Sequence, residues 1–73
     1  MSAITQKRIR EVILNMERPF RISDLFIRLE REGITDRVVI LEQLDVLCEA
    51  GLVNYAEIDD YCWAYTSILS IAG

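Results

Sequence analysis

Apolar residues recur at intervals of three and four positions in three separate stretches of the chain. This spacing places them on one face of a helix, so the sequence predicts three amphipathic helices, at about residues 5–16, 23–32 and 36–50. The predicted buried stripes are Ile9, Val12, Ile13 and Met16 in the first helix, Leu25, Phe26 and Leu29 in the second, and Ile40, Leu44, Leu47 and Cys48 in the third.

Start and stop signals accompany each predicted helix. Thr5 is expected to cap the first helix, with Ile4 and Ile9 as a hydrophobic staple across its first turn. The same pairing recurs at Ile22, Ser23 and Ile27 and again at Ile34, Thr35 and Val39, with Asp36 as a further cap candidate for the third helix. Pro19 prevents the first helix from continuing. Gly33 and Gly51 predict stops, and Leu52 is placed to fold back onto the last turn of the third helix.

The C-terminal part of the chain favours strands. Residues 52–57 and 62–66 are rich in strand-forming side chains, and Asp59 and Asp60 between them favour a turn. Residues 20–22 read as a short extended segment, a candidate third strand. The apolar residues of 67–73 either close the core or form a dimer contact. The predicted fold class is therefore mainly α with a small β hairpin (α+β), in one domain covering residues 1–73.

The segment LDVLCEAGLV, residues 44–53, follows a tight turn and an apolar-striped helix. It resembles the end of the third helix in the winged helix-turn-helix domain of the ferric-uptake-regulator family. Residues 4–9 are similar to the opening helix of that domain and residues 22–26 to its second helix, so the resemblance extends from residue 4 to about residue 66. It implies three helices and a wing of two or three strands, in a fold that typically binds DNA through the third helix.

This sequence departs from that family at the positions that would contact DNA. Leu41 and Glu42 stand where the family typically has a tyrosine and an arginine, and Val39 stands where a threonine is usual. The metal-binding second domain of the family, with its histidines and cysteines, has no counterpart here. The resemblance therefore implies the fold, but neither iron sensing nor the family's DNA contacts.

Charge separates the two halves of the chain. Residues 1–34 carry seven basic and five acidic side chains, a net charge of +2, whereas residues 35–73 carry one basic and seven acidic side chains, a net charge of −6. The predicted third helix and wing thus lie in the acidic half, which phosphate would repel. An overall charge of −4 and a pI near 4.6 also oppose non-specific binding to nucleic acid or to an anionic membrane.

Several kinds of chemistry have no signature in the sequence. The chain has no histidine and two cysteines, Cys48 and Cys62, which are interpreted as small apolar residues. It contains no phosphate-binding loop, dinucleotide fingerprint or nucleophile elbow. We therefore expect no enzyme activity, no cofactor and no metal. We also expect no membrane span and, because no secretory signal precedes the cysteines, a cytoplasmic location.

Two functions remain open, and the distribution of charge favours the first. The first is an interaction module that binds a protein partner or a second copy of itself through the third helix, the wing and the apolar tail; its candidate residues are Val38, Leu41, Glu42, Asp45, Trp63, Ile68 and Leu69. Trp63 shares a strand face with Tyr61 and Tyr65, so this aromatic side could pack on the helices, on a second subunit or on bases. The second function is a DNA-binding regulator that holds the backbone with Lys7, Arg8, Arg10 and Arg37.

Overall fold

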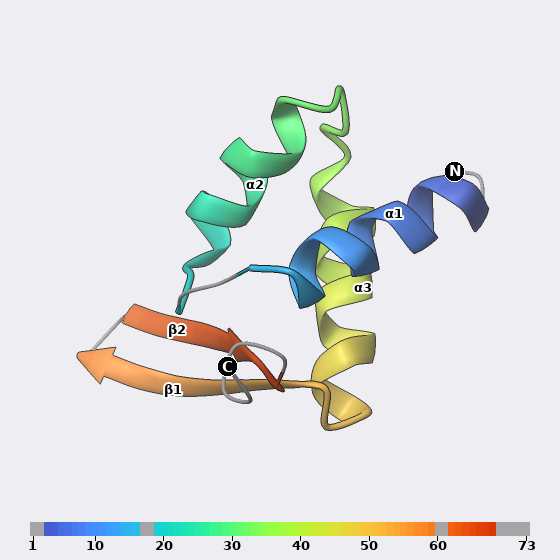
Figure 1. Ribbon diagram of the computed structural model, residues 1–73. Coiled ribbons are helices and arrows are strands. Elements are labelled where there is room, and N and C mark those ends of the chain that lie inside the picture. The colour runs from blue at the N-terminus through green and yellow to red at the C-terminus, as the bar shows by residue number, and fades with distance from the viewer. Residues whose placement is uncertain (1–2, 17–18, 60–61, 69–73) are drawn as a thin grey trace.

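The computed structural model describes residues 3–16, 19–59 and 62–68, of which residues 57–59 and 62–63 are described by their backbone alone. The described elements are α1 (Ala3–Leu14), α2 (Ile22–Glu30), α3 (Arg37–Glu49), β1 (Val53–Asp59) and β2 (Cys62–Ser67) (Figure 1). The two strands form one antiparallel sheet. The prediction of a mainly α fold with a small β hairpin is thus confirmed.

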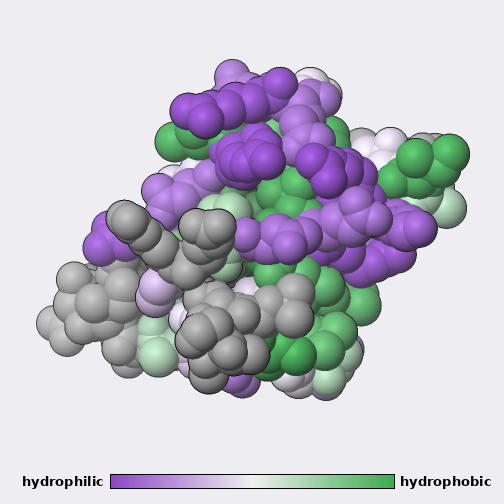
Figure 2. All heavy atoms as spheres, in the orientation of Figure 1, coloured by the Kyte–Doolittle hydropathy of each residue, from purple (hydrophilic) through white to green (hydrophobic). Residues whose placement is uncertain are grey.

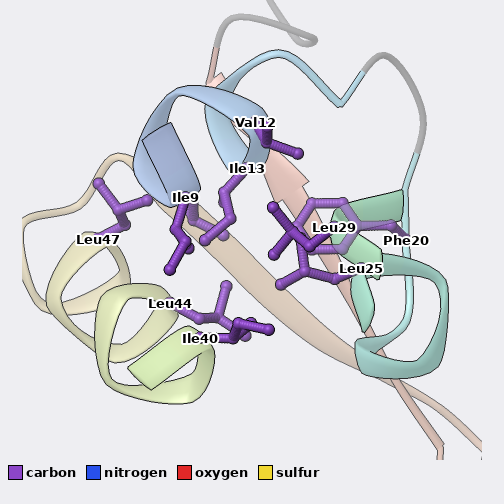
Figure 3. Packing of buried hydrophobic residues seen from close by; sticks show 10 residues of the cluster. Ile9, Val12, Ile13, Phe20, Leu25, Leu29, Ile40, Leu44 and Leu47 are labelled. Atoms are coloured by element: carbon purple, nitrogen blue, oxygen red, sulfur yellow. The ribbon is translucent and has the colours of Figure 1, made fainter. Parts of the chain in front are cut away.

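The core lies where the three helices meet. Figure 3 shows side chains of α1, α2 and α3 converging on this centre, joined by Phe20 from the segment between α1 and α2. The buried apolar residues are Ile9, Val12, Ile13, Phe20, Leu25, Leu29, Ile40, Leu44, Leu47 and Val53, and Met16, Phe26 and Cys48 pack partly buried against them. The predicted stripes therefore have the correct phase in all three helices.

The start of α3 lies where the sequence predicts it, whereas the first two helices begin earlier than predicted. Asp36 caps α3 by accepting a hydrogen bond from the Val39 amide at 3.3 Å. Thr5 is not a cap, because α1 already begins at Ala3. Ile4 is 82% exposed, so it forms no staple over the first turn.

The beginning of α2 lies one residue earlier than predicted. Arg21 is its N-cap residue, and the Asp24 carboxylate accepts a hydrogen bond from the Arg21 amide at 3.0 Å. Ile27 is 57% exposed, so the predicted staple between Ile22 and Ile27 is wrong. An acidic side chain inside the first turn therefore replaces the expected serine cap, and it also suits the positive end of the helix dipole.

Both predicted glycine stops close their helices in the same way. Gly33 and Gly51 have φ of +77° and +76°. In each case the glycine amide bonds back to a carbonyl three residues earlier, and the next amide, of Ile34 or Leu52, bonds to a carbonyl five residues earlier. This is the Schellman arrangement, which needs a left-handed residue at the glycine position. The helices end at Leu14, Glu30 and Glu49, one or two residues before the predicted limits.

The hairpin is attached to the helices along one edge. Tyr55 pairs with Tyr65 and Val53 with Ser67, and a register shift lies between residues 57 and 59. Phe20 exchanges two backbone hydrogen bonds with Tyr65, of 2.9 and 2.8 Å. The expected third strand at residues 20–22 is thus reduced to this single bridge, because Ile22 already belongs to α2.

Some predictions fall on parts that the structure does not describe. Outside the described residues lie Asp60 of the predicted turn, the side chains of Asp59 and Trp63, and the tail from Leu69 onward. Ser67, at the start of that predicted tail, is fully buried, and its hydroxyl donates a hydrogen bond to the Leu14 carbonyl at 2.7 Å. This bond fastens the end of the hairpin to α1.

Candidate functional site

The α3 helix has an inner and an outer face. Ile40, Gln43, Leu44 and Leu47 are buried on the inner face. On the opposite side, Val38, Glu42, Asp45 and Glu49 are exposed and spaced by four, three and four positions, so they form one ridge. We call these four residues the outer ridge. It consists of one valine and three carboxylates, and no ion pair between described residues involves them.

Exposed apolar side chains flank this ridge. Val38 is 67% exposed, Val46 51% and Leu41 40%. These three residues therefore lie on the surface of α3. Val46 lies on one flank of the ridge, and Leu41 lies on the other, toward the hairpin.

A groove with a volume of about 320 Å³ separates α3 from the hairpin. Its lining combines the start of α2, one flank of α3 and one face of the hairpin: Ile22, Leu41, Leu44, Asp45, Cys48, Tyr55 and Tyr65. Of these described lining residues, Asp45 is the one that carries a charge at neutral pH. This α3–hairpin groove is therefore apolar and aromatic, with a single carboxylate among its walls.

The hairpin wall of the groove is held by a row of aromatic rings. Phe20 is buried in the core and stacks on Tyr65, with ring centroids 5.8 Å apart. Tyr65 in turn contacts Tyr55, again at 5.8 Å, and Tyr55 is 58% exposed. Because the Phe20 and Tyr65 backbones are also hydrogen-bonded, the row leads from a fixed core position to an exposed ring at the mouth of the groove.

The electrostatic environment of the groove is negative. Burial raises the pKa of the Cys48 thiol, and the charge of Asp45 raises it further. Burial likewise raises the pKa of Tyr65, with smaller contributions from Cys48, Tyr55 and Asp45. Cys48 is therefore a protonated thiol at neutral pH, not a thiolate nucleophile. Asp45 is the group in the lining that would attract a cation.

The candidate DNA-binding cations have separate partners. Arg8 forms ion pairs with Glu32 at 2.7 Å and with Glu11 at 3.4 Å. Arg10 donates a hydrogen bond of 2.6 Å to the side-chain oxygen of the buried Gln43. In Figure 2, hydrophilic residues cover α2 and the middle of α1 on this face of the molecule. Arg8 is thus engaged by the turn after α2 and by its own helix, and Arg10 by α3.

The remaining two cations of that set lie apart. Arg37, at the start of α3, has its guanidinium 5.0 Å from the centre of the Phe26 ring. It borders a second, smaller depression of about 200 Å³ between α2 and α3. Lys7 is exposed on α1. The structure therefore does not assemble Lys7, Arg8, Arg10 and Arg37 around a common partner.

Glu32 is the centre of a surface ion-pair network. Besides Arg8 it accepts a hydrogen bond from Arg28 at 2.9 Å. The hydrogen bonds and charge of Arg8, followed by those of Arg28, lower the pKa of the Glu32 carboxyl, while partial desolvation opposes the shift. This network links Arg8 of α1 to Arg28 of α2 through Glu32.

The structure brings four of the predicted protein-interaction residues together and places a fifth apart from them. Val38, Leu41, Glu42 and Asp45 lie together on and beside the outer ridge. Ile68 follows β2, is 36% exposed and does not line the groove. Leu69 and the Trp63 side chain lie outside the described residues. Sequence reasoning missed the contributions of Ile22 and Tyr55. The pairing of Tyr55 with Tyr65 depends on the register shift between residues 57 and 59.

Two features are absent from the part of the chain that the structure describes. Residues 3–16, 19–59 and 62–68 contain no group of three or more cysteine, aspartate or glutamate side chains arranged to hold a metal ion. Among the same residues no helix has the length and apolar character needed to cross a membrane.

Comparisons with family models, with curated proteins and with solved structures found no match.

Proposed function

We propose that this chain is a winged-helix protein-interaction module without enzymatic activity, and that its outer α3 face and hairpin bind a partner protein. Three helices followed by an antiparallel hairpin support the winged-helix assignment. The bridge between Phe20 and Tyr65 supports it too, since a short strand after the first helix is a part of that architecture. The resemblance of residues 44–53 to the ferric-uptake-regulator family points the same way.

The observation that carries the proposal is the charge of the outer ridge. In a DNA-binding helix-turn-helix domain this surface enters the major groove and lies between two rows of phosphates. Here it presents Glu42, Asp45 and Glu49, all exposed. Each would meet a phosphate with a repulsion of about 1 kcal/mol at 4 Å in water. Three such charges on one ridge oppose DNA binding and suit a partner with basic groups.

A second copy of the chain is a weaker candidate partner. In a symmetric dimer the same patch faces itself, so the outer ridge of one protomer would meet the outer ridge of the other. Glu42, Asp45 and Glu49 would then approach their own counterparts, and like charges across an interface are unfavourable. The exposed apolar flank at Leu41 therefore fits a different protein better than a symmetric homodimer.

The DNA-binding alternative would use Lys7, Arg8, Arg10 and Arg37. Arg8 and Arg10 are engaged by Glu32 and Gln43, and Arg37 lies over Phe26. Releasing Arg10 would leave a buried amide oxygen of Gln43 without its donor. No observation of the described residues favours this alternative over protein binding.

The test is selection from a random peptide library displayed on phage, with the immobilised protein as bait. The matched control bait is Leu41→Glu, which changes one partly exposed residue of the groove. We expect peptides that bind the wild type and lose binding to Leu41→Glu, while the circular-dichroism spectra of the two baits coincide. Absence of any peptide with this dependence would contradict the proposed function, as would selected peptides that bind both baits equally.

A further inference from the structure

We propose that the α3–hairpin groove receives one arginine or lysine side chain from a basic segment of the partner, an inference that rests on the proposed function. The groove offers what a long cationic side chain requires: apolar walls, an exposed aromatic ring and a carboxylate. The walls come from α2 and α3, the exposed ring from β1 and the carboxylate from α3.

The size of the groove limits the occupant. Its volume of about 320 Å³ lies at the lower end of the range, about 300–1,000 Å³, in which small-molecule sites usually fall. A helix laid along α3 would need a longer apolar channel with several anchor positions. A single extended side chain fits a depression of this size, and the rest of the partner would lie outside it along the acidic ridge.

The walls suit the stem of such a side chain. Leu41, which is 40% exposed, and the half-buried Ile22 supply aliphatic surface, and Leu44 contributes to the lining from the inner face of α3. Lysine and arginine carry three or four methylene groups that pack on surface of this kind while their charged ends stay near water. Leu41, Asp45 and Cys48 are spaced by four and three positions, so a stem lying over Leu41 continues along α3 toward Asp45.

The polar groups suit the head of the side chain. Asp45 has no ion-pair partner among the described residues, and it is the charged group of the lining. A guanidinium or ammonium group would form a charge-assisted hydrogen bond with its carboxylate. The Tyr55 ring, which is 58% exposed and contacts Tyr65, adds aromatic surface to the same lining, and aromatic surface attracts cations.

The same groups discriminate against other occupants. A neutral apolar side chain would take water from the Asp45 carboxylate without replacing its hydrogen bonds, which is unfavourable for an ionised group. An acidic side chain would meet the charges of Asp45, Glu42 and Glu49. Burial is the main cause of the raised pKa values of Cys48 and Tyr65, and the charge of Asp45 adds a smaller contribution in the same direction. Charge complementarity therefore selects a basic segment.

The experiment uses the peptides selected on the wild-type protein and three changes. On the protein, Asp45→Asn removes the charge at nearly constant shape, and Glu30→Gln on the exposed surface of α2 serves as the matched control. On the peptide, the cationic residue is replaced by citrulline, which has the shape of arginine without its charge. Affinities are measured by fluorescence anisotropy with a labelled peptide, and circular dichroism checks the fold of each variant.

We expect the selected peptides to share an arginine or lysine. Both Asp45→Asn and the citrulline replacement should weaken binding by about tenfold, Glu30→Gln should leave it unchanged, and the two effective changes together should weaken it little more than either alone. Peptides that depend on Leu41 but contain no cation, or that bind Asp45→Asn as tightly as the wild type, would overturn this inference and leave the proposed function standing. Failure to select any Leu41-dependent peptide would overturn both.

Discussion

The inner and outer faces of α3 differ in almost every physical property. The inner face is buried, and its one polar residue, Gln43, is hydrogen-bonded to Arg10. The outer ridge is exposed and carries three carboxylates without ion-pair partners among the described residues. The inner face thus holds the fold together, while the outer face contributes little to stability and is available for binding. Substitutions on the two faces should have separable effects on folding and on function.

The largest effect should come from the inner face. Leu47 is 3% exposed, so Leu47→Ala leaves a cavity between α1 and α3 and should reduce the free energy of unfolding by about 2–5 kcal/mol. Leu41→Ala, on the same helix but 40% exposed, is the matched control and should cost less than about 1 kcal/mol. Urea denaturation followed by circular dichroism measures both. Equal losses for the two variants would contradict the division of α3 into two faces.

The second effect tests the polar contact within the inner face. Arg10→Met removes the donor of the 2.6 Å hydrogen bond to Gln43, which is 6% exposed, and should cost about 1–3 kcal/mol because the amide oxygen is left unsatisfied. Adding Gln43→Leu should restore most of this loss, since neither polar group then remains. A double-mutant cycle of unfolding free energies provides the measurement. Strictly additive losses would show that the two side chains do not interact in solution.

A smaller loss is expected where the hairpin is fastened to α1. Ser67→Ala removes the buried hydroxyl that donates to the Leu14 carbonyl at 2.7 Å, and should lower the unfolding free energy by about 1 kcal/mol. Thr66→Ala, the neighbouring residue on the other face of β2, is the control. Hydrogen exchange of the β2 amides should accelerate in Ser67→Ala and not in Thr66→Ala. Unchanged exchange in both variants would mean that this bond does not hold the hairpin.

Neutralising the outer ridge should leave the fold intact. The combination Glu42→Gln, Asp45→Asn and Glu49→Gln removes like-charge neighbours at spacings of three and four on α3. We expect stability to rise by about 0.2–0.5 kcal/mol for each relieved pair, and more so at low salt. Thermal unfolding at two salt concentrations checks this. A clear loss of stability would mean that these carboxylates have structural partners.

The smallest effect should come from the exposed network around Glu32. Arg8 and Arg28 lower the pKa of this carboxyl, so its contribution to stability is present above the ordinary pKa of 4.5 and is lost as the pH falls through the lowered value. Glu32→Gln should therefore be slightly less stable than the wild type at pH 7, and the difference should vanish in acid. Denaturation curves at several pH values test this. A difference that grows toward low pH would contradict the sign.

The helices and the core were predictable because their signals are local. The spacing of residues such as Ile40, Leu44 and Leu47 depends on helical geometry alone, and Asp36 and Gly51 act within one turn of their own helix. The cap at α2 was misassigned because a serine and an aspartate lie within its first turn, and both could satisfy the free amides. Thr5 is not a cap for a different reason: α1 already includes Ala3 and Ile4, so Thr5 lies inside the helix.

The site was less predictable because it depends on contacts between distant segments. Gln43 looks like a surface residue until Arg10 is brought against it, and Phe20 looks like a loop residue until it pairs with Tyr65. The sequence indicated Leu41 and Asp45 as candidate interaction residues on the third helix. Tyr55 joins these residues because the hairpin packs against α3, and this packing forms the groove.

The most direct test of the central claim is a titration of a labelled random-sequence DNA duplex at about 50 mM salt, where phosphate contacts are strong. Wild-type protein should show no saturable change in anisotropy, because the outer ridge repels phosphate. The charge-reversed variant with Glu42→Lys, Asp45→Lys and Glu49→Lys should bind with an affinity that falls as salt is raised. Saturable, salt-sensitive binding by the wild type, as strong as that of the reversed variant, would contradict the assignment of the outer α3 face to a protein partner.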